Sequence, residues 1–383
     1  MSEISCHVCT AETLRVVDDF DNLCRVTSDC KPWSRGGRLG VCETCGCVQK
    51  VIDKDWLNEI DKIYGDYSIY HQSDGVEQAV FDSSSGQAGL RSARLLEALS
   101  LHVGLPETGR MLDVGCGKGA MLRAFSQFAP GWTLAGAELS DKTRGEVESI
   151  ERVEALYVGE PETIPGSFDV VTMIHMLEHI PAPVEYLARL QDKLKPGGLL
   201  LIQVPNYLQN PFDLLVADHS SHFTAHTASA LVRRAGYRLV AVATDWVPKE
   251  LTVVARKEAE PQDEMETGKD HDPFDATVKV VQWLKETVRG AREVGADGSF
   301  GIFGTSIAGT WLFAEVGDVV SFFVDEDPAR IGRTFMGCPV YHPSEAPAGS
   351  HVFIALPTRI AELVRNRLAK SDVQYHLPPS LSL

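Results

Sequence analysis

The chain has 383 residues, of which 44% are hydrophobic and 23% charged, and a formal net charge of −17, which is the composition of a folded, soluble protein with two or three domains. The acidic balance argues against nucleic acid as a partner, because nucleic-acid binders need a basic face for phosphate contacts. No apolar run approaches the ~20 residues that span a bilayer, and the N-terminus lacks the pattern of a signal peptide, so we expect a cytoplasmic protein that binds no membrane.

Residues 1–70 are predicted to form a zinc-binding module. Seven of the nine cysteines lie in the first 47 residues, and "CHVC" and "CETC" are two C-x-x-C pairs. In a reducing compartment such pairs indicate a metal before disulfides. Four thiolates complete a tetrahedral structural zinc site, and the predicted ligands are Cys6, Cys9, Cys42 and Cys45. Cys24, Cys30 and Cys47 remain, and we expect small buried apolar residues there, with Cys47 as the alternative ligand to Cys45.

Residues 71–257 are predicted to form the central domain, and the stretch "GRMLDVGCGKGAMLRAF" at 109–125 is its most informative part. It indicates a buried strand, a glycine turn and a helix whose N-terminus faces a ligand. A glycine turn alone could serve a dinucleotide. Here the acid lies inside a D-x-G-x-G-x-G pattern, which resembles motif I of class I S-adenosylmethionine-dependent methyltransferases.

Three later segments agree with that resemblance. "WTLAGAELS" is a strand ending in Glu138, whose carboxylate can accept both ribose hydroxyls. "GSFDVVTMIHMLEHI" resembles the fourth strand and its loop, and "LQDKLKPGGLLLIQVPN" the fifth strand with its preceding helix and turn. Ligands bind at the carboxyl ends of such strands. The expected cofactor-binding residues are therefore Asp113, Gly115, Cys116, Gly117, Gly119, Glu138, Leu139 and His175. His175 is also a candidate to face the methyl group, and His179 is either structural or next to the cofactor.

Residues 258–276 are predicted to be a linker, because they hold eight acids and almost no large apolar residue. Residues 277–383 repeat the order of strand, glycine turn and helix, with Asp325 placed 21 residues after Gly304. That spacing is dinucleotide-like, but G-x-x-G-x-x-x-x-G is not the dinucleotide fingerprint. We therefore predict a Rossmann-like lid for the substrate in preference to NAD binding. The fold class is α/β: a class I methyltransferase Rossmann-like core, an N-terminal zinc-binding module and a smaller C-terminal Rossmann-like α/β domain.

The segment "VADHSSHFTAHTA" holds His219, His222 and His226 at spacings that would align three rings on one helix face, as in a metal site. However, "TASALVRRAGY" predicts a helix with Thr227 as N-cap and Gly236 as its stop. His219 and His222 would then precede the helix. One catalytic base in this segment is therefore favoured over a metal trio. His226 is expected at the surface or in a capping role, and His222 in packing or substrate contact.

The whole chain resembles the sugar C-methyltransferases that act on nucleotide-linked 4-keto deoxysugars. The segments that carry this resemblance are "CETCGCVQ", "YGDYSIYHQS", "DHSSHFT" and "IFGTSIAGTWLF". It implies S-adenosylmethionine and structural zinc as cofactors, His219 as general base beside Asp218, and a phenol from Tyr67 or Tyr70 near the sugar. Three positions depart from the family pattern, all on the substrate side: Val216 replaces a Tyr, Asp218 a Glu, and His222 an aromatic residue.

Methylation of a carbon next to a ketone needs a base for the α-proton and a group that stabilises the enolate. A histidine suits that proton. From the resemblance we predict an S-adenosylmethionine-dependent methyltransferase that acts on a small molecule, a nucleotide-linked sugar or related keto metabolite. The alternatives are O- or N-methylation of another small molecule, a zinc-containing RNA methyltransferase, which would need a basic surface, and a non-enzymatic binding protein with a retained cofactor pocket.

Overall fold

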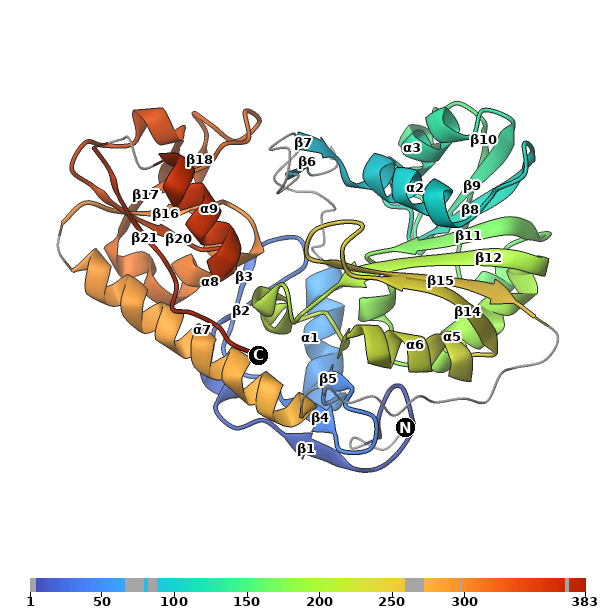
Figure 1. Ribbon diagram of the computed structural model, residues 1–383, viewed down its shortest axis with the longest axis horizontal. Helices are drawn as coiled ribbons and strands as arrows, with labels where there is room; N and C mark the ends of the chain where they lie inside the picture. Colours follow the sequence, from blue (N-terminus) through green and yellow to red (C-terminus); the bar gives the residue numbers. More distant parts are fainter. Residues whose placement is uncertain (1–4, 66–78, 82–87, 259–271, 297, 369–371) are drawn as a thin grey trace.

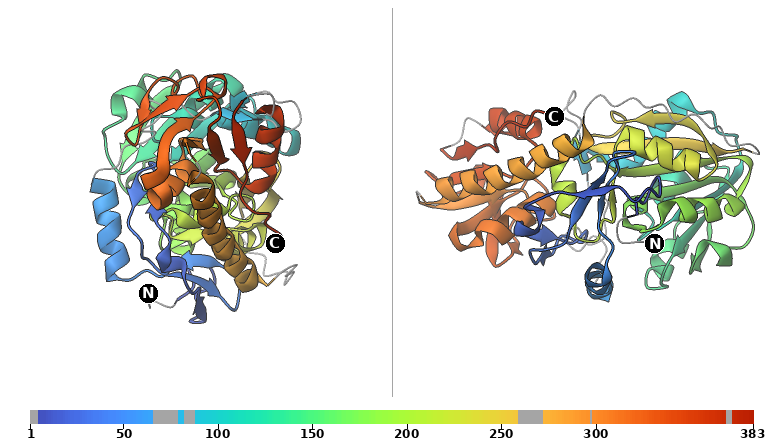
Figure 2. Two further views of the ribbon diagram at one scale, coloured as in Figure 1. Left: turned by 90° about the vertical axis from the view of Figure 1, so that its left-hand side faces the viewer. Right: turned by 90° about the horizontal axis from the view of Figure 1, so that it is seen from below.

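The computed structural model describes residues 5–65, 79–81, 88–258, 272–296, 298–368 and 372–383. Three parts follow one another along the chain, and the N-terminal part lies between the other two (Figures 1 and 2). Tyr67 and Tyr70, the predicted phenols, lie outside the described residues.

The N-terminal module is built from short strands between cysteine loops. Its sheet has the order β1-β4-β5-β13 and is antiparallel, with β1 (Leu14–Val16), β4 (Leu39–Cys42) and β5 (Val48–Lys50). The fourth strand, β13 (Ser221–His222), comes from the central domain. A separate hairpin, β2 (Arg25–Val26) and β3 (Pro32–Trp33), follows the turn η1 (Phe20–Asn22), and helix α1 (Lys54–Gly65) ends the module.

The central domain is built on a seven-stranded sheet of order β10-β9-β8-β11-β12-β15-β14. The parallel strands are β8 (Gly109–Val114), β9 (Trp132–Glu138), β10 (Val153–Val158), β11 (Phe168–Ile174) and β12 (Leu194–Pro205). They are apolar runs, as expected for strands covered on both faces. The antiparallel pair β14 (Tyr237–Ala243) and β15 (Glu250–Lys257) completes the edge. Strand order reverses between β8 and β11, which opens a crevice at their carboxyl ends.

Helices cover both faces of this sheet (Figure 1). On one face Leu95 and Leu96 of α2 pack with Leu122 and Phe125 of α3, and on the other Leu187 of α5 packs with Leu231 of α6. The remaining elements of the domain are β6 (Ala79–Phe81), β7 (Ala88–Leu90), α2 (Arg91–His102), α3 (Ala120–Phe128), α4 (Arg144–Glu148), η2 (Pro161–Thr163), η3 (Leu177–His179), α5 (Pro183–Leu190), η4 (Gln191–Lys193), η5 (Pro211–Leu215) and α6 (Ala225–Arg234).

The start of α6 corrects one prediction. Thr224, not Thr227, is the N-cap: Thr224 Oγ1 accepts a hydrogen bond from Thr227 N (3.2 Å), and Thr227 Oγ1 accepts one from Thr224 N (3.0 Å). This reciprocal capping box requires the second Thr at N3, so the helix starts earlier and includes His226. Gly236, with φ +84°, follows the helix end as predicted.

The C-terminal domain begins earlier than predicted. Helix α7 (Pro273–Gly295) starts inside the expected linker, because Asp272 Oδ1 accepts the Phe274 N–H (2.9 Å) and Pro273 suits the first helical position. The sheet has the order β18-β19-β17-β16-β20-β21, parallel except at β18. Its elements are β16 (Phe300–Phe303), α8 (Ile307–Val316), η6 (Gly317–Val319), β17 (Val320–Val324), β18 (Thr334–Phe335), β19 (Cys338–Tyr341), η7 (Pro343–Glu345), β20 (His351–Ile354), α9 (Thr358–Leu368) and β21 (Gln374–His376).

The β2–β3 hairpin joins all three parts. Its Val26 O accepts the Ala217 N–H (2.7 Å) from the central domain, and Cys24 N donates to Glu315 Oε1 (2.5 Å) on α8. Val26, Leu215 and Trp311 belong to one buried cluster. Contacts of this kind fix the mutual orientation of the parts. In the part of the chain that the structure describes, no helix is both long and apolar enough to cross a membrane.

Candidate functional site

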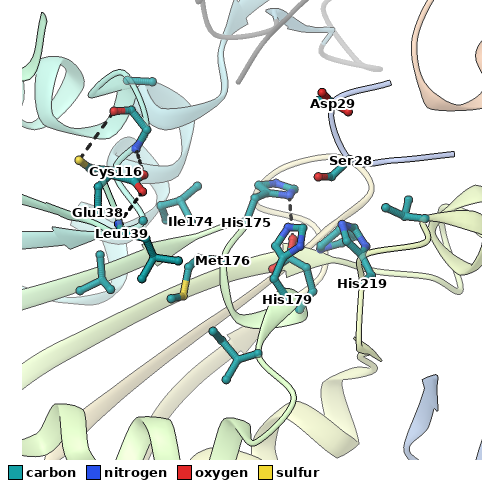
Figure 3. Close-up of a pocket in the computed structure, with 18 of the residues that line it drawn as sticks. Ser28, Asp29, Cys116, Glu138, Leu139, Ile174, His175, Met176, His179 and His219 are labelled. Atoms are coloured by element: carbon teal, nitrogen blue, oxygen red, sulfur yellow. Dashed lines mark hydrogen bonds and ion pairs between the residues drawn. The ribbon is translucent and has the colours of Figure 1, made fainter. Parts of the chain in front are cut away.

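A cavity of about 1000 Å³ lies where the three parts meet. The central domain supplies the glycine turn and Glu138 at one end and His179 and His219 at the other, with Ser28 of the N-terminal module close to the histidines (Figure 3). Ser306 and Ile307 at the start of α8 also line the cavity. A ligand filling it would therefore contact all three parts.

The turn after β8 requires its glycines. Gly115, Gly117 and Gly119 have φ values of 72°, 55° and 82°, which side-chain-bearing residues rarely adopt. A Cβ at Gly115 would lie 2.7 Å from Met176 Cγ. Below the turn, Asp113 is buried and accepts a hydrogen bond from Thr172 Oγ1 (2.6 Å). The turn is thus held rigidly with its backbone open to the cavity.

Glu138, at the end of β9, lies against this turn. Its Oε1 accepts the Gly117 N–H (2.6 Å) and its Oε2 accepts the Leu139 N–H (3.2 Å), while burial raises the pKa of the carboxyl. Cys116 lines the cavity, but its sulfur packs toward Gly136, where a Cβ would lie only 2.6 Å from it. The Leu139 side chain is 77% exposed. All of the predicted cofactor residues except Gly119 line the cavity.

His219 forms a buried pair with Asp213, not with Asp218. Its Nδ1 lies 2.7 Å from Asp213 Oδ1, and η5 carries that acid six residues before the histidine. Burial lowers the pKa of His219, but the charge and hydrogen bond of Asp213, with the charges of Glu178 and Asp218, outweigh it and raise the pKa. The prediction of Asp218 as the paired acid is wrong, because residues 216–219 form a turn in which the Asp218 carboxylate lies against Ser28 and not against His219.

Asp218 instead holds the N-terminal module. Its two carboxylate oxygens accept Ser28 N (2.8 Å) and Ser28 Oγ (2.5 Å), and the residue is fully buried. His179 Nδ1 lies 3.4 Å from the same carboxylate. This acid therefore anchors the loop after β2 to the wall of the cavity.

His175 follows β11 in a left-handed conformation, with φ 53°. Its Nδ1 lies 3.3 Å from Glu178 Oε1 and its Nε2 lies 3.1 Å from Glu250 Oε2. Although burial lowers the pKa of His175, the charge of Glu250 and the hydrogen bonds of both acids raise it to about 9. The ring is therefore a cation at neutral pH, which makes it a poor general base.

His179 lies beside His219 rather than beside the glycine turn. Its ring is edge-on to that of His219, with centroids 4.7 Å apart, and burial followed by the charge of His219 lowers its pKa. Tyr64 Oη lies 3.1 Å from His179 Nδ1. Tyr64 opens the segment "YGDYSIYHQS", so the sequence signal was present, but only the later tyrosines were singled out. Asp213 and Glu178 were missed as well.

The four predicted zinc ligands converge. Cys6 Sγ lies 3.5 Å from Cys45 Sγ, Cys9 Sγ lies 3.5 Å from Cys42 Sγ, and all four sulfurs lie within 4.8 Å of one another. A zinc ion with Zn–S bonds of about 2.3 Å needs sulfur separations of about 3.8 Å. The four thiols therefore fit a tetrahedral zinc site. Cys47 is buried nearby but donates to Val48 O (3.7 Å) and does not replace Cys45.

The other two remaining cysteines contact α8. Cys24 Sγ donates to Ala314 O (3.5 Å), and Cys30 O accepts from Thr310 Oγ1 (3.4 Å). Both are half-buried rather than fully buried, and burial raises the pKa of Cys30 to about 12, so its thiol is protonated.

Two histidine groups also have metal-ligand spacing. Glu178, His179 and His219 form one, and Asp213, His219 and His222 form the other. In the second group Asp213 already accepts from both rings, which leaves little need for an ion. The trio of His219, His222 and His226 does not form, because His226 lies in α6.

Residues 87–242 match a protein-family model described as "Methyltransferase domain". This part of the chain is similar to a methyltransferase domain. The match and the sheet order together give the domain the α/β, Rossmann-like fold of class I methyltransferases.

Curated proteins similar to the methyltransferase domain include ubiquinone biosynthesis O-methyltransferases. The protein of Xanthomonas campestris pv. campestris (strain B100) is 33% identical over 134 residues, which is 32% of this chain and 53% of that protein. The protein of Dechloromonas aromatica (strain RCB) is 33% identical over 116 residues, which is 28% of this chain and 48% of that protein. The chain spans about half the length of the curated relatives that it matches.

Solved structures resemble the same part of the chain. "PigF with SAH" is 19% identical, with a TM-score of 0.37, covering 43% of this chain and 55% of that one. A putative methyltransferase in complex with the Haloferax volcanii Trm112 activator is 16% identical, with a TM-score of 0.38, covering 44% and 91%. At these scores neither likeness identifies an activity.

Proposed function

We propose that the protein is an S-adenosylmethionine-dependent methyltransferase that acts on a small molecule. The methyltransferase-domain match and the rigid glycine turn facing Glu138 support cofactor binding. When bound, the cofactor supplies a methyl group already activated on a cationic sulfur. The protein then has to hold both molecules in line and move one proton.

We further propose that His219 is the general base. The observation that carries this proposal is the buried Asp213–His219 pair at the wall of the cavity that also holds the glycine turn. Because the Asp213 carboxylate accepts from Nδ1, that nitrogen carries the proton and Nε2 keeps its lone pair. Among the described residues no protein group is hydrogen-bonded to His219 Nε2, which leaves it free for a substrate proton.

The proposed reaction is C-methylation next to a ketone of a nucleotide-linked sugar or a related keto metabolite. Removal of the α-proton by His219 creates an enolate, and positive charge in the cavity would stabilise it. The basic side chains of His175 and Lys249 line the cavity, and the carboxylates of Glu178 and Glu250 offset part of the charge of His175. The contribution of all three parts to the cavity suits a long substrate whose far end reaches α8.

O-methylation is the second candidate, because the curated relatives of this domain are named O-methyltransferases. The same base would remove a hydroxyl proton. Independently of the acceptor, we propose structural zinc on Cys6, Cys9, Cys42 and Cys45, which the sulfur separations support.

Incubation with methyl-labelled S-adenosylmethionine and a panel of nucleotide-linked 4-keto sugars tests the acceptor. A product with a new C–CH₃ group supports C-methylation, whereas a new O–CH₃ group on a sugar hydroxyl supports the second candidate. If no sugar in the panel acquires the labelled methyl group, the assignment of a sugar substrate is wrong.

A second measurement tests the base. His219→Asn should abolish exchange of the substrate α-proton with solvent deuterium while leaving cofactor affinity unchanged. His226→Asn, which removes a half-buried ring on α6, is the matched control and should exchange normally. Normal exchange in His219→Asn would remove His219 from the mechanism.

A further inference from the structure

A continuous chain of buried polar side chains runs from His219 into the N-terminal module. Asp213 Oδ1 lies 2.7 Å from His219 Nδ1, and Asp213 Oδ2 lies 2.6 Å from His222 Nδ1. His222 Nε2 lies 3.1 Å from Lys50 Nζ. Lys50, His222 and Asp213 are each at least nine-tenths buried. The chain thus crosses from η5 through β13 to β5, where β13 and β5 pair.

The protons of this chain can be assigned. The Lys50 ammonium donates to Leu214 O and to His222 Nε2, and its charge lies 4.6 Å from the centre of the Phe20 ring. Since Nε2 of His222 accepts, its Nδ1 must donate to Asp213. Asp213 therefore receives one N–H on each oxygen, and every member of the chain is satisfied. A satisfied buried chain has one arrangement, which fixes the tautomer of both rings.

We propose that Lys50 and His222 are positioning residues that act on His219 through Asp213. His222 occupies the second oxygen of Asp213, and the charge of Lys50 behind it offsets part of the charge of Asp213, so that His219 presents an unprotonated Nε2 to the cavity. A side chain of the cysteine module would in this way take part in the site. The proposal rests on His219 being the general base.

The surrounding charges set the direction of the effect. Asp213, Glu178 and Asp218 raise the pKa of His219, while His179 and His222 face it as neighbouring rings. Burial, followed by the charge of Arg25, lowers the pKa of Lys50 to about 7, against the charges of Asp213, Asp218 and Glu59. Burial and Lys50 lower the pKa of His222 to about 4, so His222 is neutral and passes no charge of its own. Removing Lys50 leaves Asp213 more fully negative toward His219.

The experiment follows the histidine rings of the full-length, zinc-loaded protein by nitrogen NMR, with the His219 signal assigned by its loss in His219→Asn. In the unaltered protein we expect His219 to carry its proton on Nδ1 at pH above its pKa. Lys50→Met and His222→Phe should each raise the pKa of His219 by about one unit, a tenfold change in proton affinity. Asp213→Asn should lower it. Lys279→Met, which removes an exposed lysine from α7, is the matched control and should not change it.

Two results would overturn the proposal. One is an unchanged His219 pKa in a folded Lys50 or His222 variant, since a merely structural role predicts loss of stability without a shift. The other is an Nε2-protonated His219 in the unaltered protein, which needs no variant to fold. No substrate enters this titration, so its result is independent of the proposed function. If the pKa of His219 shifts in the variants but the protein transfers no methyl group, the role of Lys50 and His222 stands and the proposed function is rejected. If the protein transfers a methyl group but the pKa of His219 does not shift in the variants, the proposed function stands and the role of Lys50 and His222 is rejected.

Discussion

His175 combines an uncommon backbone conformation with a charge that two acids hold in place. Its φ of 53° is a left-handed backbone conformation, which raises the free energy of a non-glycine residue by about 1 kcal/mol or more. Such a conformation persists only where surrounding contacts enforce it. Glu178 and Glu250 supply those contacts, from the loop after β11 and the start of β15. The strain is therefore placed at the wall of the cavity, next to the proposed methyl transfer.

This pair of contacts predicts a pH dependence of stability. The pKa of His175 is about 9 in the folded protein and near 6.5 when unfolded, so the folded state binds the proton more tightly. The resulting stabilisation is complete below about pH 6.5 and is lost as the pH rises through 9, amounting to roughly 3 kcal/mol. Urea unfolding at pH 6 and pH 9.5 would measure it. A His175→Gln variant should show a flatter profile, and an equally steep one would contradict the assignment.

At the residue level, contacts could be predicted where spacing along the chain decides the local geometry. The glycine turn and Glu138 belong to one strand–turn–helix–strand unit, so their meeting at 2.6 Å follows from local geometry. The pairing of His219 with Asp213 depends on how a 3-10 turn folds back in η5, which sequence adjacency does not encode. Lys50 was not recognised because its partner lies 172 residues away.

Among the elements, α8 shows how closely the C-terminal domain is packed at the cavity. A Cβ at Gly309 would lie 2.0 Å from Gly304 O, so the helix can approach the turn after β16 only without a side chain there. The sequence correctly indicated a strand, glycine turn and helix, because the turn residues are local. The start of α6 was misplaced, because Thr224 and Thr227 both offer a possible cap, and the predicted linker extended to residue 276, inside α7.

Gly309→Ala should therefore destabilise the protein by about 1–3 kcal/mol, because the added Cβ clashes with Gly304 O. If α8 shifts to relieve the clash, substrate binding should weaken instead. Gly290→Ala, inside α7, is the matched change, because a Cβ there meets only Phe353 Cε2 at 3.8 Å. It should stabilise the protein by about 0.5–1 kcal/mol, since alanine favours a helix interior. Thermal unfolding of both variants measures the difference, and equal effects would contradict the close approach.

At the scale of the whole molecule, the cysteine module supports the cavity from outside the matched domain. Cys42→Ser should lower zinc content and cost several kcal/mol of stability, because metal binding energy is folding energy, roughly 3 kcal/mol or more. Cys338→Ser, in the C-terminal sheet, should retain full zinc. Metal analysis with urea unfolding separates the two variants. Normal zinc in Cys42→Ser would reject the four-thiolate site.

Domain order was predictable because composition changes sharply along the chain. The sequence did not predict that the central domain supplies a strand to the N-terminal sheet, since β13 has only two residues and no hydrophobic pattern of its own. Its place in the N-terminal sheet follows from pairing of Ser221 and His222 with Gln49 and Val48.

The origin of β13 also has a consequence for synthesis on the ribosome. Both cysteine pairs leave the exit tunnel well before residues 221–222, so the nascent module waits for its last strand while the intervening chain is translated. We expect the module to capture metal early but to acquire protease resistance only after β13 emerges. Limited proteolysis of stalled nascent chains, ending before and after residue 222, would show this order. Early resistance would mean that three strands suffice.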